Sequence, residues 1–481
     1  MYTVSRNTTA ITEDVILKAI EYNETLRPFY DEDLNFYKGN HPILERDLKG
    51  SKINNKVVVN HAKLITRRAT GYFMGSPVEY QVPEPETKEK KVLGFIRTKE
   101  TTSYNIDAVK EAYDEQRISN LDYLLSKWNS KCGKNYELVY IKKGTNKLRS
   151  VRLDPRNCVV AYDNSVEHNK LFAVTYDAPK KDEYENIFVY DAVLKKEYKY
   201  NPKTKKLVSV GNEVKHKIGY IPIIEFTNND DEEGDFRGVI TLINAYNILA
   251  SDRVNDKEQL VNAILALKGF TLSSKQASRL KESRILGGIP KDGDAQYLIK
   301  NLTEDQITIL KDDLKSDIYE MVGVPNMTDE NFAGNITGVA LRYKLIDFEQ
   351  LASEKEIFFE KGLLERFEIY NNYLHKVDGI PIVPTHKVKI IFHRNLPQND
   401  LEMAQTLTYL DGKVSNKTGV AQISFVEDAG KEAEQVKLEK EESSNVESPN
   451  FGSENPTPNN NNQQEQGKNQ NQNQPQSKSS K

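Results

Sequence analysis

A glycine-rich segment at residues 287–293 is the first place in this chain where chemistry could be expected. A phosphate-cradling loop has the form G-x-x-x-x-G-K-[ST], because its backbone amides surround the phosphates while its Lys and hydroxyl complete the site. The segment reads Gly-Gly-Ile-Pro-Lys-Asp-Gly and lacks the Lys-Ser/Thr ending, and no other segment fits. We therefore interpret it as a turn in a small module, and its failure to match argues against an ATP-driven motor.

An acidic stretch at residues 228–238 has part of the pattern of a calcium loop. Asn229, Asp231, Glu233 and Gly234 stand at calcium-loop spacing. Position 240, where such a loop needs a bidentate Glu, is Ile. We favour a solvated acidic turn that caps the following helix, since charge runs usually face water. A cation site is the alternative.

Histidines and cysteines are too scattered to predict a catalytic or metal site. The chain has 7 histidines and 2 cysteines, with no His-Glu-x-x-His pair and no Gly-x-Ser-x-Gly turn. Two distant thiols favour a reducing compartment over a disulfide framework. We predict no enzymatic activity, no cofactor and no metal, while the many carboxylates leave a nuclease-like acidic cluster open. The isolated candidates are His41, His61, His168, His216, Cys132 and Cys158.

Composition predicts a soluble protein of several domains without a strong overall affinity for nucleic acid. A length of 481 residues predicts about 2 to 4 domains. Lys and Arg total 67 against 71 Asp and Glu, a net charge of -4, so any DNA contact must be local or weak. No apolar run approaches the ~20 residues that span a bilayer, and the first residues lack a signal-peptide pattern. We therefore expect no membrane partner and no export.

The first half of the chain combines helices with a β-rich stretch. We predict a helix over residues 12–38 that is interrupted at Pro28, and a second helix over 60–73. Residues 80–130 read as strand, charged loop and helix. Period-two patterns then predict an antiparallel module. Its strands are expected at residues 136–142, 151–153, 159–162, 172–176, 187–190, 197–200 and 221–226.

The central region predicts two helices around a small α/β module. The first helix spans residues 239–269 between glycines, with a charged middle at 251–259. The module follows, with strands near 284–286 and 296–299. The second helix, over 303–322, ends at Gly323 and Pro325. A polar loop at 326–338 exceeds the usual ~2 to 8 residues of a helix connection, and a long amphipathic helix then runs to Tyr370 and beyond.

The C-terminal part changes from helical to polar. We expect a β-segment at residues 387–392 and helices at 400–410, 418–423 and 431–442. From residue 443 onward Asn, Gln, Ser, Pro, Gly and Lys dominate. Such a segment cannot bury enough apolar surface to offset its ordering entropy, so we predict a disordered tail.

Four stretches, in the same order along the chain, resemble one protein family. The polar loop and the residues after it read Asn331-Phe-Ala-Gly-Asn-Ile-Thr-Gly-Val-Ala-Leu-Arg-Tyr-Lys344, and the other three stretches lie at residues 54–81, 131–140 and 218–262. Together they resemble the portal proteins of tailed bacteriophages with long non-contractile tails. The resemblance covers most of residues 10–440.

The resemblance implies an α+β portal fold with long stem and wing helices. It assigns a β-rich wing to residues 1–238 and a long wing helix with a β-segment to 339–398. It assigns stem helices to 239–269 and 303–325, a small α/β clip to 270–302, and the tunnel loop to 326–338. The remaining parts are a helical crown at 399–442 and the Asn/Gln-rich tail at 443–481.

The resemblance also implies a function. Portal proteins form a homo-oligomeric ring, usually of twelve subunits, at one capsid vertex, and double-stranded DNA passes through it during packaging and ejection. Expected partners are terminase, head-tail connector or adaptor proteins, and the major capsid and scaffolding proteins. The expected location is the virion, with the host cytoplasm during assembly. A near-neutral chain suits a conduit, because a strongly basic channel would hold DNA, which carries a charge every ~1.7 Å.

Two groups of candidate site residues follow from the resemblance. In the loop, Asn and Thr side chains would touch phosphates without reading sequence, while Gly334 and Gly338 let the backbone move. In the clip-like module, basic side chains would contact DNA or an acidic partner. The alternative, which is equally open, is that these side chains are ordinary solvated charges without a partner. The loop group is Asn331, Phe332, Asn335, Thr337, Arg342 and Lys344. The clip group is Lys275, Arg279, Lys281 and Arg284.

Two other functions remain as alternatives at this point. One is an enzyme of the packaging apparatus, such as a terminase or nuclease, although the missing phosphate loop speaks against an ATPase. The other is a helical scaffold that merely oligomerises and is not a portal. ATP hydrolysis by the purified protein would distinguish the enzyme from a portal. A negative-stain image without a ring and an axial hole would distinguish the scaffold from a portal.

Overall fold

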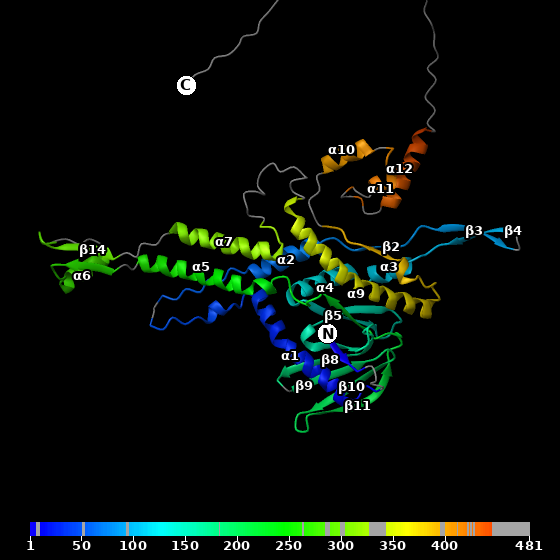
Figure 1. Cartoon of the computed structure of the whole chain (residues 1–481), viewed down its shortest axis with the longest axis horizontal. Helices are drawn as coiled ribbons and strands as arrows, with labels where there is room; N and C mark the ends of the chain where they lie inside the picture. The colour runs from blue at the N-terminus through cyan, green and yellow to red at the C-terminus, as the bar shows by residue number, and fades with distance from the viewer. Residues whose placement is uncertain are drawn as a thin grey trace, which may run out of the picture. The chain divides into compact units, whose positions relative to one another are not determined.

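The computed structural model describes residues 1–444 apart from 6–9, 51–52, 93–95, 182, 262–263, 284–288, 299–303, 327–342, 395–399, 411, 421–422, 424–425 and 427–428. The chain divides into two compact units, Met1–Leu396 and Pro397–Lys481, and each is described by itself. Helices and mainly antiparallel sheets occupy separate stretches of the first unit (Figure 1), so the predicted α+β class is confirmed.

Helix α1 (Glu13–Lys38) is continuous, so the predicted interruption at Pro28 is wrong. Thr12 caps it by accepting a hydrogen bond from the Val15 N–H at 3.4 Å. A proline inside a helix removes one hydrogen bond and costs ~3 kcal/mol. Packing on both sides of Pro28 outweighs that cost. Ile16 and Ile20 are buried against a sheet, and Tyr30 and Leu34 pack against Cys132.

A six-stranded sheet forms the β-rich module, in the order β1-β7-β8-β9-β10-β11. The predicted antiparallel pairing is confirmed from β7 to β11, whereas β1 pairs parallel with β7, Tyr2 lying opposite Ala161. The sequence pattern missed β1 because its partner lies far along the chain, and it also missed β11. The strands are β1 (Tyr2–Val4), β7 (Cys158–Asp163), β8 (Lys170–Lys180), β9 (Glu183–Tyr190), β10 (Leu194–Asn201) and β11 (Lys206–Lys215).

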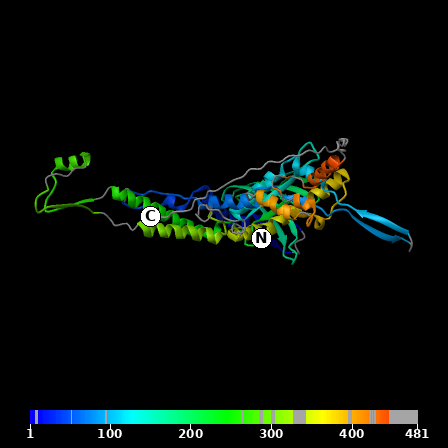
Figure 2. The same cartoon turned by 90° about the horizontal axis from the view of Figure 1, so that it is seen from above.

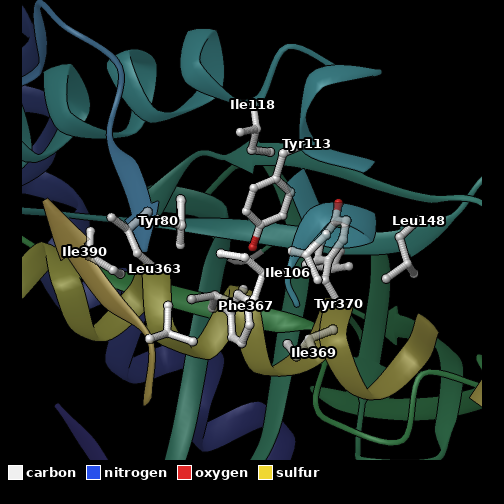
Figure 3. Close-up of a cluster of buried hydrophobic side chains, with 14 of the residues drawn as sticks. Tyr80, Ile106, Tyr113, Ile118, Leu148, Leu363, Phe367, Ile369, Tyr370 and Ile390 are labelled. Atoms are coloured by element: carbon white, nitrogen blue, oxygen red, sulfur yellow. The ribbon is translucent and has the colours of Figure 1, made fainter. Parts of the chain in front are cut away.

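A second sheet, β12-β5-β6, packs against the long helix α9. Its strands are β12 (Ile223–Thr227), β5 (Lys134–Ile141) and β6 (Leu148–Leu153), and helices α3 (Asp107–Asp114), α4 (Ile118–Cys132) and α9 (Ile346–Asp378) complete this core. Figure 3 shows Phe367 and Tyr370 of α9 beside Tyr113 of α3. The helix approaches the sheet so closely that a Cβ on Gly362 would lie 2.4 Å from a Phe226 ring carbon.

A fully buried ionic cluster ties α9 to this sheet. The Arg366 side chain has 0% exposure. Its Nη2 donates to Glu137 Oε2 at 2.7 Å, and its Nη1 forms an ion pair with Asp122 Oδ1 at 2.6 Å. Burial raises the pKa of the Asp122 carboxyl to about 6, against the lowering effect of Arg366. Such a cluster is worth little relative to an apolar core, but removing one member leaves an unpaired buried charge.

The acidic stretch after β12 is only partly the solvated turn that we expected. Asp230, Asp231 and Glu233 are exposed. Asp235 instead points inward, where it accepts hydrogen bonds from the Ser130 hydroxyl and from Lys355 Nζ, the latter at 2.5 Å. Among the described residues, no group of three or more His, Cys, Asp or Glu side chains could hold a metal ion. The stretch therefore joins α4 to α9 in this structure.

Two backbones cross at Gly133 and Gly234. Gly133 ends α4 with φ 76°, and a Cβ there would lie 1.8 Å from the Glu232 carbonyl oxygen. A Cβ on Gly234 would lie 2.3 Å from the Lys131 carbonyl oxygen. The Asn228 N–H donates to the Gly133 carbonyl at 2.8 Å. Only glycine permits both the left-handed conformation and this approach.

Two small strand pairs also belong to the first unit. β2 (Glu79–Gln81) pairs with β15 (Lys389–Ile391), which confirms the predicted late β-segment. β3 (Glu86–Val92) and β4 (Ile96–Thr102) form a hairpin where we expected a charged loop. Charged residues disfavour strands, so the local pattern gave no signal for this pair, in which Lys88 is in register with Glu100 and Glu89 with Lys99.

The central region contains three described helices and a two-stranded sheet. They are α5 (Ile240–Val261), β13 (Ile264–Lys268), α6 (Ser274–Ser283), β14 (Asp294–Leu298) and α7 (Glu304–Val322). The predicted helix over 239–269 is therefore wrong beyond Val261, because Ile264–Lys268 pairs with β14. A short apolar run has no periodicity that distinguishes strand from helix. The predicted strand near 284–286 lies outside the described residues, whereas the one near 296–299 is β14.

The remaining elements agree with the expected pattern. Helix α2 spans His61–Met74, and Asn60 caps it by accepting from the Lys63 N–H at 2.9 Å. Short 3-10 helices occur at Pro42–Glu45, Pro155–Asn157, Arg237–Val239 and Thr385–Lys387. The second unit contains α10 (Asp400–Leu410), α11 (Asn416–Val420) and α12 (Ala429–Ser444). The predicted disordered tail lies outside the described residues, apart from Ser443 and Ser444, which end α12.

None of the described helices is both long and apolar enough to cross a membrane.

Replacing Gly133 with Ala should destabilise the first unit by about 3 kcal/mol, because the backbone strain of ~1 to 2 kcal/mol adds to a collision with Glu232. Gly144→Ala is the matched control, since Gly144 has φ 79° but nothing within 4 Å of its Cβ position. It should lose only the strain. Urea denaturation followed by the fluorescence of Trp128, the one tryptophan, measures both. Equal losses in the two variants would contradict the close crossing.

Candidate functional site

Helices α5 and α7 lie side by side and run in opposite directions, and we call this pair the arm (Figures 1 and 2). β13, α6 and β14, which we call the tip module, lie at the end of the arm where α5 leads out and α7 returns (Figure 1). The inner ends of both helices pack on α2, with Ile243, Tyr246, Ile318 and Tyr319 buried in one cluster with Ile65. Helix α2 therefore anchors the inner end of the arm through this buried apolar cluster.

A ladder of hydrogen bonds fastens α5 to the extended segment before α2. Three polar side chains of α5, four residues apart, accept from every second backbone N–H of that segment. Four helical residues rise ~6 Å and two extended residues span ~6.6 Å, so the two repeats match. The pairs are Asn247 with Val59 at 2.8 Å, Ser251 with Val57 at 2.9 Å and Asn255 with Asn55 at 2.7 Å.

Buried His41 extends this ladder into the body of the protein. Asn247 Nδ2 lies 2.8 Å from His41 Nδ1, and His41 Nε2 lies 3.0 Å from the Phe36 carbonyl. A carbonyl can only accept, so Nε2 donates to Phe36 and Nδ1 accepts from Asn247. Burial lowers the pKa of His41, which matches this neutral form. The end of α1, the extended segment and α5 are thus joined by one chain of hydrogen bonds.

Buried His61, the first residue of α2, lies between the two arm helices. Its ring meets the Tyr246 ring of α5 edge-on at 4.7 Å, and its Nδ1 lies 3.1 Å from the Tyr319 hydroxyl of α7. Its Nε2 is buried without a hydrogen-bond partner among the described residues. Burial, reinforced by Lys315 and other cations, lowers the pKa of His61 to about 4. The neutral ring therefore serves as the contact between the arm and α2.

The same helix contacts the chain on both sides of residues 327–342, which lie outside the described part of the chain. Before the loop, Arg68 Nη1 donates to the Pro325 carbonyl at 3.0 Å. After the loop, the Tyr72 ring stacks on Phe348 of α9 at 4.1 Å, and the Tyr72 hydroxyl donates to Glu349 at 2.6 Å. Consecutive turns of α2 thus contact the chain just after α7 and at the start of α9.

The predicted site residues are placed only in part. Lys344 lies just before α9 with an exposed side chain. Lys275, Arg279 and Lys281 share helix α6, and the Lys275 side chain is exposed. The remaining predicted residues lie outside the described part of the chain. They are Asn331, Phe332, Asn335, Thr337, Arg342 and Arg284.

Sequence reasoning missed the ladder and both buried histidines. The sequence pattern indicated only a charged middle for α5 and an ordinary surface or hydrogen-bonded role for His41 and His61, and it did not predict their burial between the elements. A signal for the ladder was present in the sequence. Asn247, Ser251 and Asn255 repeat every four residues in a helix with apolar ends, opposite an alternating Asn55-x-Val57-x-Val59.

A model of the phage portal protein family described as SPP1 Gp6-like matches residues 17–446. The chain belongs to this family of phage portal proteins, which confirms the resemblance seen in the sequence. The family is structural and not enzymatic, so the protein is not an enzyme and its place is in the phage particle.

Two relatives carry the same description. The portal protein of Bacillus phage SPP1 is 24% identical over 429 residues, which cover 82% of this chain and 78% of that relative. The portal protein of Clostridium phage phiCD119 is 26% identical over 238 residues, covering 47% of this chain and 50% of that relative. A structure of the neck of a native GTA particle, computed with C12 symmetry, matches with a TM-score of 0.40 at 12% identity. It covers 76% of this chain and 88% of that one.

Acidification should loosen the arm through His61. Because the folded pKa is about 4 and the ordinary value is 6.5, the folded state binds fewer protons than the unfolded state between these values. Stability present above pH 6.5 is therefore lost as the pH falls toward 4, by ~3 kcal/mol at most. His61→Gln should remove this pH dependence.

Urea denaturation at about pH 7 and about pH 4.5 tests this expectation. The quantity compared is the difference in the free energy of unfolding between wild type and His61→Gln at each pH. Taking a difference cancels Asp33 and Asp122, whose raised pKa values act in the opposite direction. His386→Gln, at an exposed histidine, is the control and should behave as wild type. An unchanged pH dependence in His61→Gln would show that His61 is not the titrating contact.

Proposed function

We propose that copies of this chain close into a ring, of twelve subunits, at one capsid vertex and conduct double-stranded DNA during packaging and ejection. The arm carries the proposal. A pair of helices can bury only the faces that meet, and large apolar side chains remain on the outside. Ile309 is 60% exposed and Leu310 is 50% exposed on α7, and Ile248 and Val254 are exposed on α5. In a cyclic ring the neighbouring arms cover such surfaces through head-to-tail contacts.

The charge of α7 supports the role of a conduit. This helix has six acidic and two basic residues, a net charge of two minus six, or -4. Acidic walls repel phosphates, so they let DNA slide without the tight hold that released counterions would give a basic channel. The net charge of α7 alone equals that of the whole chain, so the rest of the protein is neutral on balance.

The parts of the fold then receive portal roles. Residues 1–238 and 339–398 form the wing, α5 and α7 the stem, the tip module the clip, and residues 399–442 the crown. The clip receives terminase and later the head-tail connector proteins, with Lys275, Arg279, Lys281 and Arg284 as contacts. The ring also meets the major capsid and scaffolding proteins in the host cytoplasm, where it initiates capsid assembly.

The loop between α7 and α9 is the proposed constriction of the channel. Its length exceeds a usual helix connection of ~2 to 8 residues, and α2 holds the chain on both sides of it. Asn331, Asn335 and Thr337 would contact phosphates, with Phe332, Arg342 and Lys344 beside them.

Replacing Ile309 and Leu310 with Asp should abolish rings while each subunit stays folded, because burying two charged groups in place of apolar ones costs each contact several kcal/mol, about 3 or more. Negative-stain imaging and light scattering of the purified protein show the assembly, and circular dichroism shows folding. The control places the same charge at exposed Val193 and Val208 of the β-rich module. A wild type that is monomeric at every concentration, or rings that persist in the arm variant, would contradict the proposal.

Replacing Asn331 and Asn335 with Glu should leave rings and capsids intact but reduce packaged DNA severalfold, because acidic groups at the narrowest point repel the duplex. Nuclease-protected DNA per capsid measures the effect. Asn146→Glu, on an exposed turn, is the control. Normal packaging would remove the loop from the mechanism, and a loss of rings would make it a subunit contact instead.

A further inference from the structure

A cavity of about 470 Å³ lies between β5 and the adjoining ends of β9, β10 and β11. Its apolar lining comes from both sheets and from the segment that connects β11 to β12. The main apolar contributors are Leu138, Val139, Ile141, Tyr190, Ile218 and Pro222. A cavity of this size accepts a ligand group of several heavy atoms, since ligand pockets run from ~300 to ~1,000 Å³.

The charged residues that line this cavity are all basic. They are Lys195, Lys215 and Lys217, with His216 beside them, and no Asp or Glu among the described residues lines the cavity. The Lys195 ammonium lies 3.8 Å from the centre of the Phe188 ring and 5.5 Å from that of Tyr190. Partial burial lowers the pKa of Lys195. Among the described residues, no carboxylate forms an ion pair with this half-buried ammonium.

His216 shapes one wall of the cavity. Its Nε2 lies 2.9 Å from the Asp191 carbonyl, and its Nδ1 accepts from the Ile218 N–H at 3.3 Å. Because the carbonyl can only accept, these two bonds describe a neutral ring that holds the connecting segment in place. The Val139 N–H donates to the Pro222 carbonyl at 2.8 Å and fixes the other end of that segment. The cavity is thus formed before anything binds, which lowers the ordering cost of binding.

Apolar surface continues beyond the mouth of the cavity. Tyr140 lines it and is 42% exposed, and Val214, which is 59% exposed, is the β11 neighbour of Lys195 in the strand register. A small molecule would leave this rim uncovered, whereas a peptide segment would cover it. The lysines around the rim complement carboxylates in such a segment.

We propose that this basic cavity binds an acidic peptide segment of a partner protein, which inserts one apolar side chain between the two sheets. Carboxylates that flank the apolar residue pair with Lys195, Lys215 and Lys217. The site lies between the β-rich module and the second sheet. None of its lining residues belongs to the arm or to the tip module, and the proposal does not depend on the proposed ring.

Fluorescence anisotropy of the full chain with a labelled peptide, acetylated Asp-Glu-Phe-Glu-Asp amide, tests the proposal. We expect saturable binding that weakens about tenfold when Phe becomes Ala and at least as much when the carboxylates become amides. The double variant Lys195→Glu with Lys217→Glu should bind about tenfold more weakly or worse. Ile141→Trp, which fills the cavity without changing charge, should weaken binding similarly while thermal unfolding shows that both variants are folded.

The control variant Lys199→Glu with Lys206→Glu changes the same charge at exposed positions farther along β10 and β11, and it should bind as wild type. Equal loss in this control would reduce the effect to general electrostatics and overturn the proposal. So would equal binding of the Phe and Ala peptides, or wild-type binding by Ile141→Trp. Displacement of the peptide by a short DNA duplex would assign the cavity to nucleic acid and also overturn it.

Discussion

The arrangement of this protein depends on the match between a helical repeat of four residues and an extended repeat of two. Asn247, Ser251 and Asn255 of α5 satisfy alternate N–H groups of the segment that ends at Val59. An extended segment without a neighbouring strand would otherwise leave buried donors unpaired, at ~1 to 3 kcal/mol each. The ladder also fixes the register of α5, because a shift by one residue would turn all three side chains away.

Helix α2 positions the elements of the central region relative to one another. It contacts α5 and α7 through His61, the end of α7 through Arg68, and the start of α9 through Tyr72. The buried charges Arg366 and Lys355 then hold α9 on the second sheet and on the stretch that follows β12. The arm and α9 are therefore joined to the rest of the first unit by specific polar and aromatic contacts inside apolar clusters.

Local patterns located most elements well, and their errors have a common origin. The helices around Asn60 and Gly323 were predicted because caps and glycine ends are local signals. The uninterrupted α1 at Pro28, the parallel strand β1 and the strand Ile264–Lys268 were missed, because each depends on a partner distant in sequence. The inward Asp235 was missed for the same reason, since nothing adjacent to it shows that Lys355 will face it.

The sequence by itself determined the α+β class, the order of the elements and the family, because periodicity, caps and ordered motifs are properties of neighbouring residues. Only the tertiary structure decided which polar residues are internal. From the sequence alone, the Asn and Ser residues of α5 and the two buried histidines look like surface residues. Their roles come from burial and from partners distant in sequence, as with Asn247 and Val59, which are 188 residues apart, and no local pattern encodes such a contact.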